Sequence, residues 1–153
     1  MSNNELWLKD VWPIMKEVID SGGEFTFLPH GTSMLPLIRQ GEDRVVIAPA
    51  ENIQQGDVVF YQRDNGQFVL HRIVKVKNGG YVMCGDNQYF YEYGITDKHI
   101  LAKMKAVIRD GETIDCNSKK YIKYVKKLPF RRFMLKIKSV FRRIKNKIFK
   151  KSK

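Results

Sequence analysis

Three residue types that can take part in nucleophilic and acid–base chemistry stand in short, distinctive segments of this 153-residue chain. They are a serine in a glycine-containing loop, a histidine in an apolar run and an aspartate in a turn: Ser33 in residues 30–38, His71 in residues 69–74 and Asp86 in residues 84–87. A serine hydroxyl is a weak nucleophile at neutral pH and needs a base within hydrogen-bond reach. Imidazole, whose ordinary pKa is about 6.5, is able to act as such a base. Taken alone, the serine segment is equally typical of a surface loop that leads into a buried run.

The segments around these residues follow one another in a distinctive order. Glycine and acidic residues precede two β-branched runs, in residues 41–46 and 56–60, and the His71-Arg72 run and the Gly85-Asp86-Asn87 turn come next. Each segment alone is a weak signal, whereas the ordered set is specific. The set resembles the signal peptidase I and LexA-type serine peptidase superfamily, and the resemblance extends from about residue 27 to about residue 109.

The resemblance implies roles for Ser33 and His71. Bacterial signal peptidases and LexA-type proteins place a lysine base where His71 stands, and the endoplasmic-reticulum-type signal peptidases place a histidine before the same arginine. Ser33 is then the nucleophile, His71 the general base and Arg72 a structural neighbour. A histidine base suits neutral pH without deep burial, whereas a lysine must be desolvated before its pKa falls toward neutrality. The implied activity is that of a serine endopeptidase that forms an acyl-enzyme.

The acid that orients the histidine is less closely defined by the resemblance. Asp86 occupies the matching Gly-Asp-Asn segment, which implies an orienting or supporting acid, and it is our preferred candidate, although Glu92 or Asp97 could serve instead. Such a carboxylate is useful because it holds the imidazole in the tautomer that a base requires.

The groups that would hold the oxyanion differ from the common pattern of the superfamily. Many signal peptidases place a second hydroxyl two residues before the nucleophile, and that position is Gly31 here. We therefore expect backbone amides, such as that of Ser33, to hold the oxyanion, with Thr32 as a side-chain helper. Met34 either lines the substrate groove or fills the core. The expected substrate is an extended peptide that adds to a sheet edge beside Ser33.

Hydrophobic periodicity predicts a mostly β body with a helix before it. Apolar residues recur every three or four positions from residue 4 to residue 21, which predicts a helix that Pro13 kinks or breaks. Short β-branched or aromatic runs predict strands at residues 24–28, 44–48, 57–62, 67–77, 81–84 and 103–109, with hairpin turns at 64–66 and 78–79. Such closely spaced strands predict a coiled antiparallel sheet, or partial barrel, of the signal-peptidase-like (LexA-like) fold.

Positive charge is concentrated in residues 119–153, which contain 16 Lys and Arg and no acidic residue, whereas residues 1–118 carry a net charge of −4. An apolar stripe recurs at three- and four-residue steps in this tail: Phe130, Phe133, Met134, Ile137, Phe141, Ile144 and Ile148. The stripe predicts an amphipathic helix with Pro129 in its first turn. Apolar burial and attraction to acidic lipids suit an anionic membrane surface. Docking onto the acidic body ranks second, and nucleic acid ranks third because phosphate binding gains nothing from a bulky apolar face.

The chain then divides into an N-terminal amphipathic helix (residues 1–23), a serine peptidase domain (24–118) and a basic C-terminal helix (119–153). No run approaches the roughly 20 apolar residues of a membrane-spanning helix. Acidic residues near the N-terminus are unlike a secretory leader, and the usual N-terminal anchor of signal peptidases is missing. Two cysteines and three histidines lack the spacing of a metal site, so we expect no metal or cofactor.

These observations favour a signal-peptidase-like serine endopeptidase that is cytoplasmic and peripherally bound to a membrane. The alternative is a catalytically inactive, membrane-associated peptide-binding or regulatory protein of the same fold. The two differ in whether Ser33 reacts.

Overall fold

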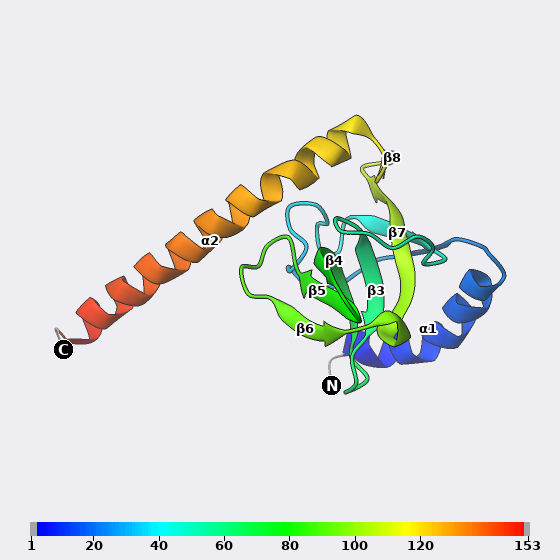
Figure 1. Cartoon of the computed structure of the whole chain (residues 1–153), viewed down its shortest axis with the longest axis horizontal. Helices are drawn as coiled ribbons and strands as arrows, with labels where there is room; N and C mark the ends of the chain where they lie inside the picture. The colour runs from blue at the N-terminus through cyan, green and yellow to red at the C-terminus, as the bar shows by residue number, and fades with distance from the viewer. Residues whose placement is uncertain (1–2, 152–153) are drawn as a thin grey trace.

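An eight-stranded, mostly antiparallel sheet that does not close into a barrel forms the body of the protein, with one helix at each end of the chain (Figure 1). The computed structural model describes residues 3–151, and side chains within residues 8–146. The strands are β1 (Phe25–Phe27), β2 (Arg44–Ala48), β3 (Val58–Gln62), β4 (Phe68–Lys77), β5 (Gly80–Cys84), β6 (Glu92–Ile95), β7 (Ile100–Arg109) and β8 (Glu112–Asp115). They lie in the order β1-β2-β7-β3-β4-β5-β6, and β8 pairs with β7. The predicted fold class is confirmed.

Tight turns join the three central strands, as the sequence predicts. Gly66, between β3 and β4, and Gly79, between β4 and β5, both adopt positive φ, at 82° and 83°. The first turn sets the β3–β4 register, which pairs Val59 with His71. Tyr61 lies two residues beyond Val59 and therefore on the same face of the sheet, diagonal to His71.

Two short strands, β6 and β8, lie outside the predicted set. β6 contains Gly94 and pairs along one side only, with β5, and its burial does not alternate cleanly. β8 folds back on β7 through Asp110 and Gly111, which have φ values of 50° and 83°. An Asp-Gly pair between β-forming runs is a hairpin signal. The sequence therefore contained enough information to predict β8, but not β6.

Helix α1 (Asn3–Asp20) packs against the sheet and completes the main core. Met15 and Ile19 are buried, and the ring of Trp12 lies 5.8 Å from the rings of both Phe60 and Phe68. The helix continues through Pro13 and does not break into two helices. Apolar contacts on both sides of the proline hold the two halves on one core, which offsets the cost of the missing hydrogen bond.

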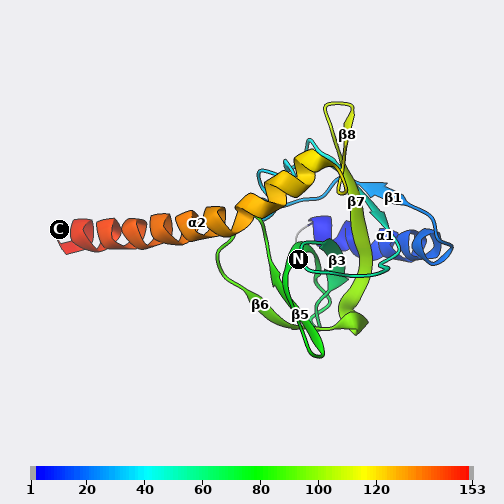
Figure 2. The same cartoon turned by 45° about the horizontal axis from the view of Figure 1, so that its top comes forward.

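Helix α2 (Lys119–Lys151) leaves the body near β8 and extends well beyond it (Figures 1 and 2). It begins at residue 119, as predicted, where the Ser118 hydroxyl accepts a hydrogen bond from the Tyr121 N–H at 3.2 Å and caps the first turn. Tyr121 and Leu128 are buried against the body. The placement of Pro129 in the first turn is therefore wrong, since this residue lies inside the helix.

The two sides of α2 have different surroundings. The side that meets the body buries Leu128, Arg132 and Ser139, and the Ser139 hydroxyl is 2.7 Å from that of Tyr89. Helical geometry places the predicted apolar stripe on the opposite side. Its exposed members are Phe130, Phe133, Met134, Phe141 and Ile144. The side chain of Ile148 lies outside the described residues.

No helix in the described part of the chain combines the length and the apolarity that crossing a bilayer requires.

Candidate functional site

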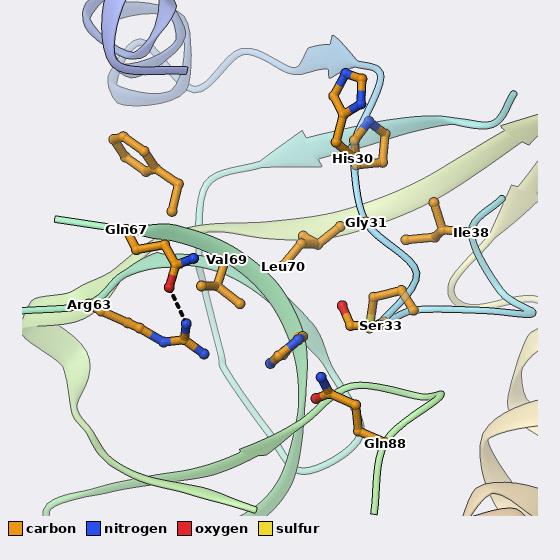
Figure 3. Close-up of a pocket in the computed structure, with 13 residues that line it drawn as sticks. His30, Gly31, Ser33, Ile38, Arg63, Gln67, Val69, Leu70 and Gln88 are labelled. Atoms are coloured by element: carbon orange, nitrogen blue, oxygen red, sulfur yellow. Dashed lines mark hydrogen bonds between the residues drawn. The ribbon is translucent and has the colours of Figure 1, made fainter. Parts of the chain in front are cut away.

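Ser33 and His71 line one cavity of about 270 Å³, although 38 positions separate them in the chain (Figure 3). Ser33 lies half-buried in the loop between β1 and β2, and His71 lies on β4. Met34, Arg63 and Gln88 also contribute to the lining. The structure thus brings together the two residues that the resemblance assigned as nucleophile and base.

The Gly85-Asp86-Asn87 turn holds the serine loop in place. The Asn87 N–H donates to the Ser33 carbonyl at 2.8 Å, and the Asn87 side-chain amide donates to the Thr32 carbonyl at 3.2 Å. A Cβ atom on Gly85 would lie 2.6 Å from the Ser33 carbonyl oxygen, closer than real Cβ atoms approach. Glycine is therefore required at position 85 for the two loops to meet.

His71 is buried and neutral at physiological pH. Only 6% of the residue is exposed, and this burial lowers its pKa from 6.5 to about 4. The negative charge of Glu92 opposes the shift and the positive charge of Arg63 adds to it. A neutral imidazole has a free lone pair, so His71 can accept a proton at pH 7.

A hydrogen-bonded chain from Glu92 through Tyr61 fixes the tautomer of His71. The Tyr61 hydroxyl donates its single proton to Glu92 Oε2 at 2.7 Å, and its oxygen lies 3.4 Å from His71 Nδ1. The oxygen can then only accept from the ring, so the proton of the imidazole resides on Nδ1. Nε2 carries the free lone pair, which is the arrangement of a histidine base.

Arg63 keeps Glu92 ionised and in position. The guanidinium donates to both carboxylate oxygens, with Nε to Oε1 and Nη2 to Oε2 both at 2.6 Å. Burial would raise the pKa of Glu92, but the hydrogen bonds from Arg63 and Tyr61 outweigh it and lower the pKa. Glu92 Oε2 is 3.9 Å from His71 Nδ1. Glu92 is therefore the carboxylate that faces the imidazole.

Asp86, our preferred orienting acid, lies elsewhere. It is fully buried and accepts from Arg72, with Nε to Oδ1 at 2.8 Å and Nη2 to Oδ2 at 2.6 Å, and from the Tyr124 hydroxyl at 3.0 Å. No hydrogen bond joins it to His71 within the described side chains. Consecutive residues of a strand face opposite sides of the sheet. Arg72 thus points away from His71 and holds Asp86 on its own side of the sheet, where it does not orient the imidazole but can support the site.

The remaining predicted residues divide between the cavity and its surroundings. Met34 is 4% exposed, belongs to the main core and also lines the cavity, so both of its predicted roles are compatible with its position. Thr32 is exposed and lies outside the lining. Asp97 accepts a hydrogen bond from Tyr81 and does not contact His71.

Three contributors to the site were not predicted: Tyr61, Arg63 and Gln88. Tyr61 had a signal, because the turn at residues 64–66 fixes the register that places it beside His71. The other two depend on where Glu92 and the Gly85–Asn87 turn lie in space, which no local pattern encodes.

Helix α2 also reaches the turn behind the site. Arg131 donates to the Asp86 carbonyl at 3.3 Å and to the Asn87 side-chain oxygen at 3.1 Å. The hydroxyl of Tyr124, which lies seven residues before Arg131 on α2, donates to the Asp86 carboxylate. The first half of α2 therefore braces the turn that holds Ser33.

Within the described residues, no group of three or more His, Cys, Asp or Glu side chains is arranged to hold a metal ion.

Comparison with known proteins agrees with this geometry. A search of curated proteins finds no match to the chain. Residues 3–105, about two thirds of the chain, match the family model described as Peptidase S24-like. With an unclosed antiparallel sheet that carries the serine and the histidine in the expected order, the chain belongs to the Peptidase S24-like family of the LexA and signal peptidase-like superfamily.

Proposed function

We propose that this protein is a serine endopeptidase that cleaves extended peptides through an acyl-enzyme on Ser33, and that it works at a membrane surface. The observation that carries the catalytic part is the cavity that Ser33 shares with a buried His71, whose Nδ1 lies 3.4 Å from the Tyr61 hydroxyl oxygen. The family assignment supports a peptidase fold.

The proposed reaction uses the lone pair of His71 Nε2. Ser33 Oγ attacks the scissile carbonyl while Nε2 takes the hydroxyl proton, and the carbonyl electrons move to the oxygen to form an oxyanion. The imidazolium then gives its proton to the leaving amine as the C–N bond breaks. Water repeats the sequence to release the acyl group. The charge of the ionised Glu92, 3.9 Å from Nδ1, stabilises the imidazolium.

Glu92 takes the orienting role that we first assigned to Asp86. It acts through the Tyr61 hydroxyl, which makes Tyr61 a positioning residue. Asp86 instead supports the site from behind by fixing Arg72 and the turn that holds Ser33.

The catalytic proposal predicts that a serine-directed acylating probe modifies Ser33 and no other serine. After incubation, intact mass should show one adduct, and peptide mapping should place it on Ser33. Ser33→Ala should give no adduct, whereas Ser21→Ala, which changes an exposed serine at the end of α1, should react as the wild type does. A folded wild-type protein without an adduct would favour the inactive peptide-binding alternative.

The membrane part of the proposal is supported by the exposed apolar stripe of α2. The helix meets the body with its other side, so docking onto the body leaves Phe130, Phe133 and Phe141 without partners within the described structure. Exposed lysines and arginines flank the stripe: Lys136 and Arg143 on one side, and Lys138, Arg142 and Lys145 on the other. Each well-placed cation near an anionic bilayer contributes roughly 1 kcal/mol. An anionic lipid surface therefore matches the stripe in both polarity and charge.

We expect the Phe133→Ser variant to bind anionic vesicles about tenfold more weakly, because burial of a phenylalanine side chain contributes on the order of 1.5–3 kcal/mol. Flotation with anionic and with neutral vesicles measures the effect. Phe90→Ser is a matched control, since Phe90 and Phe133 are both 59% exposed but only Phe133 lies on α2. Equal losses in the two variants, or equal binding to neutral vesicles, would contradict the membrane proposal.

A further inference from the structure

Gln88 lines the same cavity as Ser33 and His71, immediately after the turn that holds the serine loop. Figure 3 shows its amide nitrogen on the side where the Ser33 hydroxyl lies. The residue is polar, half-buried and uncharged. It has no part in the hydrogen-bonded chain that orients the imidazole.

Contacts with Gly85 fix the direction of the Gln88 amide. The Gly85 N–H donates to Gln88 Oε1 at 3.2 Å, and the Gln88 N–H donates to the Gly85 carbonyl at 3.1 Å. A Cβ atom on Gly85 would lie 2.8 Å from Oε1, so the absent side chain at position 85 makes room for this arrangement. Because the oxygen accepts from the backbone, the two N–H groups of Nε2 point the other way. Within the described residues, no protein group accepts a hydrogen bond from Nε2.

Apart from backbone amides such as that of Ser33, the serine loop presents no donor to an oxyanion in this cavity. Gly31 has no side chain, and its N–H already donates to Gln40 Oε1 at 3.2 Å. The exposed Thr32 lies outside the lining. Arg63 also lines the cavity, but each of its three guanidinium nitrogens already donates a hydrogen bond to Glu92 or Gln67. Gln88 is thus the side chain in this lining that presents an uncommitted N–H donor beside Ser33.

We propose that Gln88 Nε2 donates a hydrogen bond to the oxyanion that forms when Ser33 attacks its substrate. This role rests on the proposed function. No bond to Gln88 forms or breaks, and the amide only stabilises the negative charge on the former carbonyl oxygen. A pre-positioned donor of this kind accelerates acyl transfer because it requires no reorganisation during the reaction.

The test compares two variants that remove the donor in different ways. Gln88→Glu keeps an oxygen that can accept from Gly85 and replaces the N–H groups with a carboxylate oxygen. Gln88→Met removes both polar ends without adding charge. Loss of one oxyanion donor lowers the rate by about 10²–10³-fold, so both variants should acylate with a lower limiting rate and an unchanged probe affinity. Gln55→Met, the same change at an exposed amide outside this cavity, should behave as the wild type does.

The measurement is the rate of adduct formation on Ser33 as a function of probe concentration, with melting temperature recorded in parallel. If Gln88→Met loses stability, Gln88→Glu decides the question, because it retains the anchoring contact. Acylation of the wild type together with wild-type limiting rates in the stable Gln88 variants would overturn the role of Gln88 alone. Absence of acylation in the wild type would overturn both the proposed function and this role.

Discussion

A Glu92→Gln variant is expected to acylate Ser33 about 10²-fold more slowly than the wild type, since general-base catalysis contributes roughly 10²–10⁴-fold. An amide at position 92 can donate to the Tyr61 oxygen, and the Tyr61 proton is then free to point toward His71 Nδ1. The proton of the imidazole would move to Nε2, where the base needs a lone pair. Replacement of the orienting carboxylate thus leaves the ring in place but in the wrong tautomer.

Two further variants serve as references for this acylation rate. His71→Gln removes the base and sets the lowest rate that the remaining site can support. Asp97→Asn is the matched control, because Asp97 was an alternative acid in the sequence but contacts Tyr81 instead of the imidazole chain. It should react as the wild type does. A normal rate in Glu92→Gln, or a slow one in Asp97→Asn, would contradict the assignment of Glu92.

The Glu92→Gln variant should also change the pH dependence of the acylation rate in a defined direction. Burial lowers the pKa of His71 to about 4, so the wild-type rate should persist below pH 6 and fall as the pH falls through about 4. The charge of Glu92 raises the pKa of His71. Without this charge, the remaining acylation rate of the variant should begin to fall at a lower pH than the wild-type rate does. A shift to higher pH would show that Glu92 does not act on the imidazole through its charge.

The Asp86→Asn variant is expected to lose about 3–5 kcal/mol of unfolding free energy, the usual cost of breaking a buried ion pair. Asp86 is fully buried and Arg72 is 1% exposed, with two short hydrogen bonds between them. Asparagine leaves the guanidinium as an unbalanced charge in the interior. The loss therefore reflects the burial of Arg72 as much as the energy of the pair itself.

Urea unfolding provides the measurement, and Asp110→Asn provides the control. Asp110 is also paired with an arginine, at 2.8 Å from Arg39, but 74% of its side chain is exposed. An exposed pair contributes about 0–1 kcal/mol, so this variant should be nearly as stable as the wild type. The double variant Arg72→Met/Asp86→Met should regain part of the loss. Equal stability of Asp86→Asn and Asp110→Asn would contradict a structural role for Asp86.

Much of the fold follows from local patterns. The Asn-Gly turns at Gly66 and Gly79 join β3 to β4 and β4 to β5, and the β-branched runs on either side of each turn form these strands. The β4 run carries His71 toward the serine loop. These local signals predict the strand that carries His71, whereas the approach of Ser33 to His71 was implied by the resemblance to the superfamily.

The choice between Asp86 and Glu92 could not be made in the same way. Alternation along β4 shows that His71 and Arg72 face opposite sides, and this argument already separates Asp86 from the imidazole once Arg72 is known to bind it. The approach of Glu92, however, depends on the path of residues 88–91 and on the pairing of β6 with one edge of β5. That path is set by tertiary packing.

The C-terminal helix α2 was also only partly predictable from the sequence. Its apolar stripe was evident from periodicity, but the side that docks contains Arg132 and Ser139, which no hydrophobic pattern marks. Pro129 was misplaced because the cap at Ser118 starts the helix well before the stripe begins.

The contacts of Tyr124 and Arg131 with the Gly85–Asn87 turn have a practical consequence. Both residues lie beyond residue 105, where the family match ends. A recombinant protein trimmed to the matched segment would keep its nucleophile and base while losing two of the side chains that steady the loop beneath them. Such a cut would also fall inside β7, so low reactivity in the shortened protein would not count against the site, and the intact chain is the proper reference for every rate.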